Sequence, residues 1–172
     1  MRWVERASRF DLPVELFPAV VERLRGTPGR IEEKVAGIAA DVLTRRNGDK
    51  WSIQEHVGHL LDLDELHAGR LDDYLAGAEV LRPADITNRK TTEANHNRRT
   101  MAELTQAFRK ERLRFVERLE TWDPERRGLT AIHPRLKQPM RVIDMAWFVA
   151  EHDDHHLARM TELARKFSVR SA

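Results

Sequence analysis

The chain has 172 residues, of which 41% are hydrophobic and 34% are charged, a length and composition that predict one soluble domain spanning residues 1–172. Its 30 basic and 28 acidic residues leave a net charge of only +2, which argues against a nucleic-acid-binding protein because such proteins carry a marked positive excess. There is no cysteine, so disulfides, cysteine-based zinc sites and a protein thiol nucleophile are excluded.

Charged residues also interrupt the apolar segments that export or membrane insertion would need. They stand at positions 2, 5, 6, 9 and 11, a pattern that is not typical of the apolar core of a signal peptide. No uncharged apolar run approaches the roughly 20 residues that span a bilayer. We therefore expect a cytoplasmic protein that does not contact a membrane.

The first predicted helix covers residues 17–38, where apolar side chains recur at alternating spacings of four and three. Asp11 followed by Pro13 is typical of the approach to a helix start. Pro28 lies inside the pattern and should remove a backbone hydrogen bond. Because the apolar stripe keeps its phase across Pro28, we predict one kinked helix rather than two short ones.

The second predicted helix begins at Ser52, which forms a capping-box pattern with Glu55, and it ends at Gly77. The third covers residues 101–119, and the fourth begins near Pro139 and continues to residue 163.

The two longer connections, residues 78–99 and 123–138, are polar and rich in turn residues. The alternation typical of strands is almost absent from the chain. These patterns predict an all-α protein, a four-helix bundle with long crossover loops.

The fourth predicted helix carries three histidines within the stretch EHDDHH at residues 151–156. On a helical wheel His152 and His156 lie at the edge of the apolar arc, one turn apart, whereas His155 points away from it. The spacing of four lets two imidazoles bind one ion, and imidazole suits zinc, nickel, copper or iron. The alternative is that both histidines are core-edge side chains bonded to the backbone or to acids.

A metal site would need at least a third protein ligand, and the second predicted helix offers His56, His59 and His67. His56 and His67 lie nearer the centre of its apolar face, whereas His59 lies toward one edge. An edge position can still face the interior, because each helix of a bundle meets two neighbours. The spacing therefore does not choose among the three histidines.

The sequence resembles the DinB-like (DinB/YfiT) family, which includes bacillithiol transferases and mycothiol-dependent isomerase domains. The resemblance lies in KWSIQEHVGHLLDLDE at 50–65, in HPRLKQPMRVIDMAWFVAEHDDHHLARM at 133–160, and in LRGTPGRIEEKVAGI of the first helix. It implies a DinB/YfiT-like bundle whose metal ligands are His59, His152 and His156. It implies no ligand role for the other histidines, which are His56, His67, His96, His133 and His155.

Three neutral imidazoles leave a coordination position open, which is typical of catalytic rather than structural metal sites. The resemblance thus implies a metal-dependent transferase or hydrolase in which a divalent ion, zinc or nickel, activates a thiol or a water. The expected partners are a small-molecule substrate, a low-molecular-weight thiol and a second copy of the chain in a homodimer. The alternative is a non-enzymatic, stress-linked metal-binding or dimerisation module of the same fold.

No residue of the sequence stands out as a general base. Asp62 lies one turn after His59, and Asp153 points toward the apolar side of the fourth helix. Either carboxylate could orient a ligand imidazole through its second nitrogen. For Asp62 the alternative is a nearby arginine partner, and Asp153 needs some partner because it lies within an apolar arc. Two basic connections, residues 82–99 and 126–141, could attract an anionic substrate if they border the site.

Overall fold

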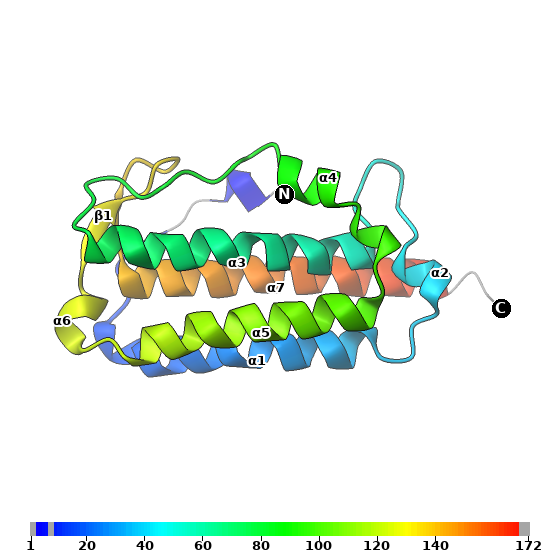
Figure 1. Ribbon diagram of the computed structural model, residues 1–172, viewed down its shortest axis with the longest axis horizontal. Coiled ribbons are helices and arrows are strands. Elements are labelled where there is room, and N and C mark those ends of the chain that lie inside the picture. Colours follow the sequence, from blue (N-terminus) through cyan, green and yellow to red (C-terminus); the bar gives the residue numbers. More distant parts are fainter. Residues whose placement is uncertain (1–2, 7–8, 169–172) are drawn as a thin grey trace.

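The computed structural model describes residues 3–6 and 9–168 and confirms the four-helix bundle (Figure 1). Residues 1–2, 7–8 and 169–172 of the expected domain, Arg2 among them, lie outside the described residues. The four long helices are α1 (Phe17–Val35), α3 (Ile53–Leu75), α5 (Met101–Glu120) and α7 (Val142–Ser168). The short elements are η1 (Trp3–Glu5), η2 (Val14–Leu16), α2 (Ala40–Leu43), α4 (Arg89–Ala94), η3 (His96–Arg98), α6 (Pro124–Arg127), β1 (Thr130–Ile132) and β2 (Pro139–Arg141).

The direction of the helices determines how the connections run. The colours of Figure 1 show α1 and α7 running one way along the bundle and α3 and α5 running the other way. Both α1 and α3 pack against α5 and α7, so α1 and α3 lie diagonally opposite each other. Because α3 and α5 are parallel, residues 76–100 must return along the bundle, and they place α4 and η3 against α3.

The capping residues explain where the helices begin. The Oγ atom of Ser52 accepts a hydrogen bond from the Glu55 amide at 3.1 Å, and the Glu55 carboxylate accepts one from the Ser52 amide at 2.9 Å. Thr100 and Glu103 form the same capping box at the start of α5. Gly77 follows α3 with a φ of 69°, a left-handed conformation that favours glycine. The predicted start and end of the second helix are thus confirmed.

Pro28 lies inside α1, which confirms the prediction of one helix across this residue. The helix ends at Val35 rather than at Ile38, because Gly37 adopts a φ of 75° that a right-handed helix does not allow. Its first turn follows Pro13 through the 3₁₀ turn η2.

The fourth predicted helix begins later than expected, because Pro139 belongs to a strand. Strands β1 and β2 pair antiparallel, with Thr130 opposite Arg141 and Ile132 opposite Pro139. Each strand has three residues, too few to produce a recognisable alternation in the sequence. The Tyr74 hydroxyl donates to the Met140 carbonyl at 3.0 Å and thereby attaches this hairpin to α3.

A buried ion-pair group adds a polar element to the apolar interior of the bundle. The Arg112 side chain of α5 is fully buried and donates to Asp64 of α3 at 2.8 Å and to Asp153 of α7 at 3.1 Å. Asp153 also accepts from the Thr27 hydroxyl of α1 at 3.0 Å. All four long helices therefore meet at this group of side chains.

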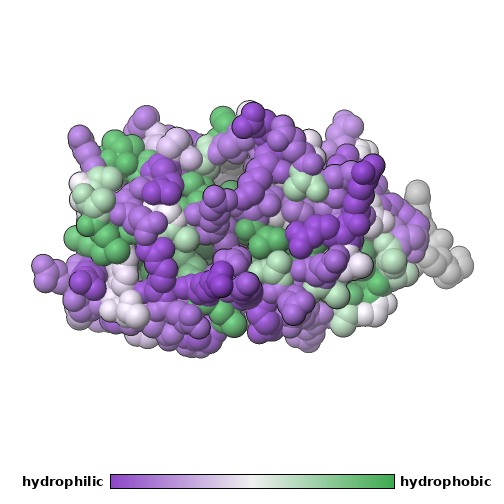
Figure 2. Space-filling view, in the orientation of Figure 1, coloured by the Kyte–Doolittle hydropathy of each residue, from purple (hydrophilic) through white to green (hydrophobic). Residues whose placement is uncertain are grey.

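The outer surface in Figure 2 is mostly hydrophilic, with apolar patches between charged side chains. Within the described part of the chain, no helix is long and apolar enough to cross a membrane.

Gly58 lies where α3 meets the ring of His96, and a Cβ atom at this position would overlap that ring. We expect Gly58→Ala to lower the free energy of unfolding by about 1–3 kcal/mol, because the ring must move away from Asp62. Gly26 of α1 has nothing within 4 Å of its Cβ position, so Gly26→Ala is the control and should stabilise by about 0.5–1 kcal/mol. Urea unfolding that shows the same change for both variants would contradict this packing.

Candidate metal centre

The antiparallel arrangement of α3 and α7 brings His59 together with His152 and His156. His59 lies near the start of α3, and the other two lie near the middle of α7. All three side chains are buried, and each offers a ring nitrogen within 4.8 Å of the other two. The structure therefore places side by side the three histidines that the resemblance implied.

The two histidines of α7 have their Nε2 atoms directed at each other. The Nε2 atoms of His152 and His156 lie 3.1 Å apart. Two nitrogens on a tetrahedral zinc ion, each about 2.0–2.1 Å from the metal, would lie roughly 3.3 Å apart. The Nδ1 atom of His152 is buried without a partner among the described residues. The donor set and its spacing thus fit a divalent ion.

A hydrogen-bond relay sets the tautomer of His59. Thr91 of α4 donates its hydroxyl proton to the Asp62 carboxylate at 2.9 Å, and its oxygen lies 3.1 Å from Nδ1 of His59. Because the single hydroxyl proton is used, Thr91 can only accept from His59, so the His59 proton is on Nδ1. The unprotonated Nε2 of His59 is then free to bind a metal.

His56 contacts the ring of His156, as Thr91 contacts the ring of His59. Their Nδ1 atoms lie 2.7 Å apart, a distance that requires one ring to donate to the other. Donation from His156 leaves its Nε2 lone pair directed at His152. His56, one of the three candidate ligands in the second predicted helix, thus lies behind His156 and can orient it.

Burial keeps these imidazoles neutral, which is the form that binds metal. It lowers the pKa of His59 to about 4 and that of His56 to about 3. Burial also lowers the pKa of His152 and of His156 well below the ordinary histidine value, and the neighbouring imidazoles act in the same direction.

Asp62 acts on the site through Thr91 and does not bond His59 directly. It also accepts from Nε2 of His96 at 2.8 Å, so its partners are a threonine and a histidine rather than an arginine. Burial opposes ionisation of Asp62, but the hydrogen bonds from His96 and Thr91 lower its pKa overall. Asp62 therefore remains a carboxylate that can hold the relay in one orientation.

The partners of Asp153 are Arg112 and Thr27, and no contact of Asp153 with a ring nitrogen of the three histidines occurs among the described residues. This candidate orienting residue is instead part of the buried ion-pair group. Its place in the apolar arc of α7 is explained by the charge of Arg112.

The remaining histidines occupy different surroundings. His155 is half-buried rather than directed into solvent, because Trp3 of the N-terminal segment lies against it with ring centroids 5.9 Å apart. His67 and His133 are buried in the wall of the adjoining cavity. His96 lies outside that wall and holds Asp62. None of these four belongs to the cluster of possible ligands in the described part of the chain.

A cavity of about 1100 Å³ adjoins the three histidines, which form part of its wall. The Trp51 ring covers one side of the cluster, with its centroid 4.5 Å from that of His59 and 6.1 Å from that of His156. Leu63 and Leu66 of α3 continue the wall away from the cluster. The possible metal site therefore opens onto a space large enough for a small molecule.

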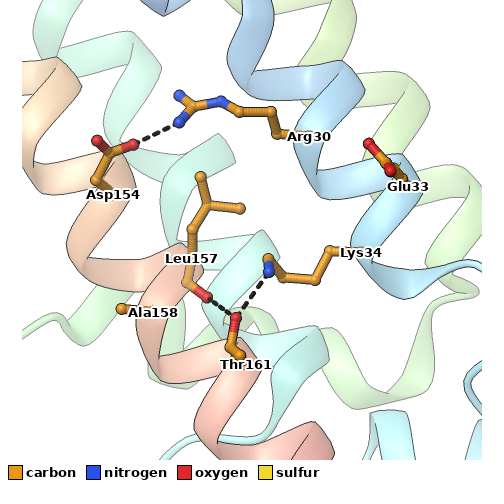
Figure 3. Close-up of a pocket in the computed structure, with 7 residues that line it drawn as sticks. All are labelled: Arg30, Glu33, Lys34, Asp154, Leu157, Ala158 and Thr161. Atoms are coloured by element: carbon orange, nitrogen blue, oxygen red, sulfur yellow. Dashed lines mark hydrogen bonds and ion pairs between the residues drawn. The ribbon is translucent and has the colours of Figure 1, made fainter.

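A second hollow, between α1 and α7, has none of these properties (Figure 3). Its Arg30 side chain pairs with Asp154 at 2.7 Å, and Lys34 donates to Thr161 at 2.7 Å. Arg30, Lys34 and Asp154 thus have partners within the wall of this hollow, and we assign no function to it.

Thr91 offers a direct test of the relay. Replacing it by valine removes the acceptor for Nδ1 of His59, so we expect zinc affinity to fall about 10–100-fold. Thr92→Val is the matched control, because the Thr92 hydroxyl is exposed and bonds only the Asn88 carbonyl among the described residues. Competition with a chromogenic chelator measures both affinities, and equal affinities would contradict the role of Thr91.

Comparison with known proteins agrees with this architecture. A model of the DinB superfamily matches residues 23–160. Among solved structures, the chain is similar to YfiT from Bacillus subtilis, described as a probable metal-dependent hydrolase with an unusual four-helix bundle topology. The two share 20% sequence identity with a TM-score of 0.79, over 95% of this chain and 94% of that one. A likeness at this identity shows the fold, and no curated protein sequence matches the chain.

Proposed function

Because the chain belongs to the DinB superfamily, we propose that it is a metal-dependent enzyme in which His59, His152 and His156 bind one divalent ion. The observation that carries the proposal is the convergence of three buried, neutral imidazoles beside a cavity. Three ligands leave a coordination position open, and this is the catalytic pattern for zinc. Nickel has the same preference for imidazole and is the second candidate ion.

When bound, such an ion supplies a Lewis acid that activates a water or a thiol. The residues of the chain prepare and protect this chemistry. Thr91 sets the tautomer of His59, and His56 orients the His156 ring, so that both rings direct a nitrogen to one point. The Trp51 ring and the leucines of α3 give the cavity an apolar wall beside the three histidines, which lowers the local polarity and strengthens electrostatic interactions there.

Hydrolysis and thiol transfer are the two reaction classes that we propose. The description of YfiT as a probable hydrolase supports the first. The absence of cysteine supports the second only in that the thiol would have to come from a co-substrate such as bacillithiol. In both classes the substrate is a small molecule that fits the cavity.

Two assays on zinc-loaded and nickel-loaded protein separate these classes. One measures hydrolysis of a panel of esters and amides, and the other measures conjugation of an electrophile with bacillithiol, mycothiol or glutathione. We expect metal-stimulated turnover in one assay and its loss in His156→Ala. A protein that binds metal but shows no metal-stimulated rate in either assay would contradict the proposal.

That outcome would favour the alternative, a non-enzymatic metal-binding or dimerisation module. Such a module needs metal for stability and has no use for an open coordination position beside a cavity. The position of the three histidines in the cavity wall therefore supports an enzyme over a non-enzymatic module.

A homodimer and a cytoplasmic location remain predictions. Large apolar side chains that are exposed in the single chain could contribute to a dimer interface, and they are Leu16, Leu75, Val80 and Ile86. Sedimentation equilibrium at micromolar concentration would show whether the chain pairs.

A further inference from the structure

The cavity has a second end, marked by a buried arginine for which the described residues provide no acidic partner. Arg70 of α3 lines the cavity with only 2% of its surface exposed. Its Nε and Nη2 atoms both donate to the Arg82 carbonyl at 3.2 Å. No carboxylate bonds the Arg70 guanidinium in the described part of the chain, so its remaining N–H groups have no protein acceptor there.

The surroundings of Arg70 are positive rather than neutral. Asp73 is the carboxylate whose charge acts on it, but Asp73 is held by Arg82 through a bond of 2.7 Å and a second of 3.0 Å. Burial lowers the pKa of Arg70, and the charges of Arg135 and Arg82 lower it further. Guanidinium nevertheless stays protonated in proteins, so the cavity wall contains a buried charge that an anion would stabilise.

His133 supplies a second donor in the same wall. Its Nδ1 atom accepts a hydrogen bond from the Leu136 amide at 3.1 Å. In the neutral ring the proton is therefore on Nε2, which makes this atom a donor. Burial and the nearby charge of Arg70 lower the pKa of His133 to about 4, so the ring stays neutral near pH 7.

The spacing along α3 relates this end of the cavity to the three histidines. His59, Leu63, Leu66 and Arg70 follow one another at intervals of four, three and four, which places them on one face of the helix. Eleven residues of helix correspond to roughly 16 Å. The two leucines between the ends give the cavity an apolar middle. Other charged residues of the cavity are of both signs, and Arg70 differs from them because it is buried and pairs with no acid in the described part of the chain.

We propose that Arg70 and His133 bind an oxyanion of the substrate, a carboxylate or a phosphate. The substrate is then an elongated small molecule whose anionic end lies at Arg70 and whose apolar segment lies along Leu63 and Leu66. Its reactive group lies at the three histidines, and this last statement alone rests on the proposed function. The anion site itself needs no metal.

Calorimetric titration of the metal-free protein with octanoate, octyl phosphate and 1-octanol tests the site. We expect at least one anion to bind about tenfold more tightly than octanol, because a charged pair in a buried wall is stronger than a neutral contact. If octanoate binds more tightly than octyl phosphate, the site prefers a carboxylate, and the reverse order shows that it prefers a phosphate. Arg70→Met should remove the preference and leave octanol binding unchanged.

Arg109→Met is the control for loss of one positive charge, since Arg109 is half-buried and pairs with Glu32 outside the cavity. If Arg70→Met does not fold, Arg70→Lys is used instead, because it keeps the charge. The affinities of the unaltered protein for octanoate and octanol then still show whether the site prefers an anion. Equal affinities, or no binding of either anion at millimolar concentration, would overturn the inference. Because no metal is present, this result is independent of whether the three histidines bind an ion.

Discussion

Replacing His156 by alanine is expected to lower the affinity for zinc on the order of a thousandfold. Loss of a residue that only orients a ligand costs about 10–100-fold, and loss of the ligand itself costs more. The His156 ring contributes one of the three convergent nitrogens, and its Nε2 lies 3.1 Å from that of His152. Equilibrium dialysis combined with chelator competition measures the change for both zinc and nickel.

His155→Ala is the matched control, because His155 is adjacent in sequence and half-buried but lies outside the cluster. Its zinc affinity should stay within a fewfold of that of the unaltered protein. Stoichiometric metal in His156→Ala would show that the three-histidine assignment is wrong. Equal losses in both variants would indicate general damage to α7 rather than loss of a ligand.

Replacing Arg112 by methionine should lower the free energy of unfolding by about 3–5 kcal/mol, the usual cost of breaking a buried ion pair. The change leaves Asp64 and Asp153 buried without a countercharge. Burial already raises the pKa of Asp64 to about 6, although the charge of Arg112 opposes this shift. Urea unfolding of the metal-free protein at neutral pH measures the loss.

Two further variants distinguish the cost of leaving buried carboxylates unpaired from the cost of removing an arginine. Arg109→Met breaks a partly exposed pair with Glu32 near the surface and should cost less than about 1 kcal/mol. The triple variant Asp64→Leu, Arg112→Met, Asp153→Leu should recover most of the stability, because apolar groups can replace a complete buried ion-pair network. A cost for Arg112→Met as small as that for Arg109→Met would contradict the buried network.

The long helices could be predicted because their signals are local. Ser52 and Glu55 satisfy each other within one turn, and the capping box they form is visible in four residues of sequence. The pairing of His152 with His156 also depends only on the helical period. By contrast, the strand that contains Pro139 depends on a partner seven residues or more upstream, and each strand is too short to show a pattern.

The choice of His59 could not be made from periodicity, and the structure shows why. The first eight residues of α3, Ile53–Leu60, are all buried, so this part of the helix has no solvent face that would distinguish His56 from His59. Resemblance to the family implied His59, and its position beside His152 and His156 depends on the packing of α3 against α7, whereas its contact with Thr91 depends on the return of residues 76–100. Thr91 lies in that return and carries no periodic signal, so its contact with His59 could not be predicted.

The same limit applies to the two aspartates considered as orienting residues. Asp62 is one turn from His59 in sequence, but its effect passes through Thr91, a residue 29 positions away. The need of Asp153 for a partner could be predicted from its apolar surroundings. That Arg112 is this partner depends on how α5 and α7 face each other across the interior of the bundle.

The most direct test of the central claim is elemental analysis of the protein purified without an affinity tag, alongside His156→Ala prepared in the same way. If His59, His152 and His156 bind a divalent ion, the unaltered protein should contain close to one zinc or nickel per chain. The variant should contain almost none. Protein without metal, even after incubation with either ion and removal of the excess, would contradict the claim.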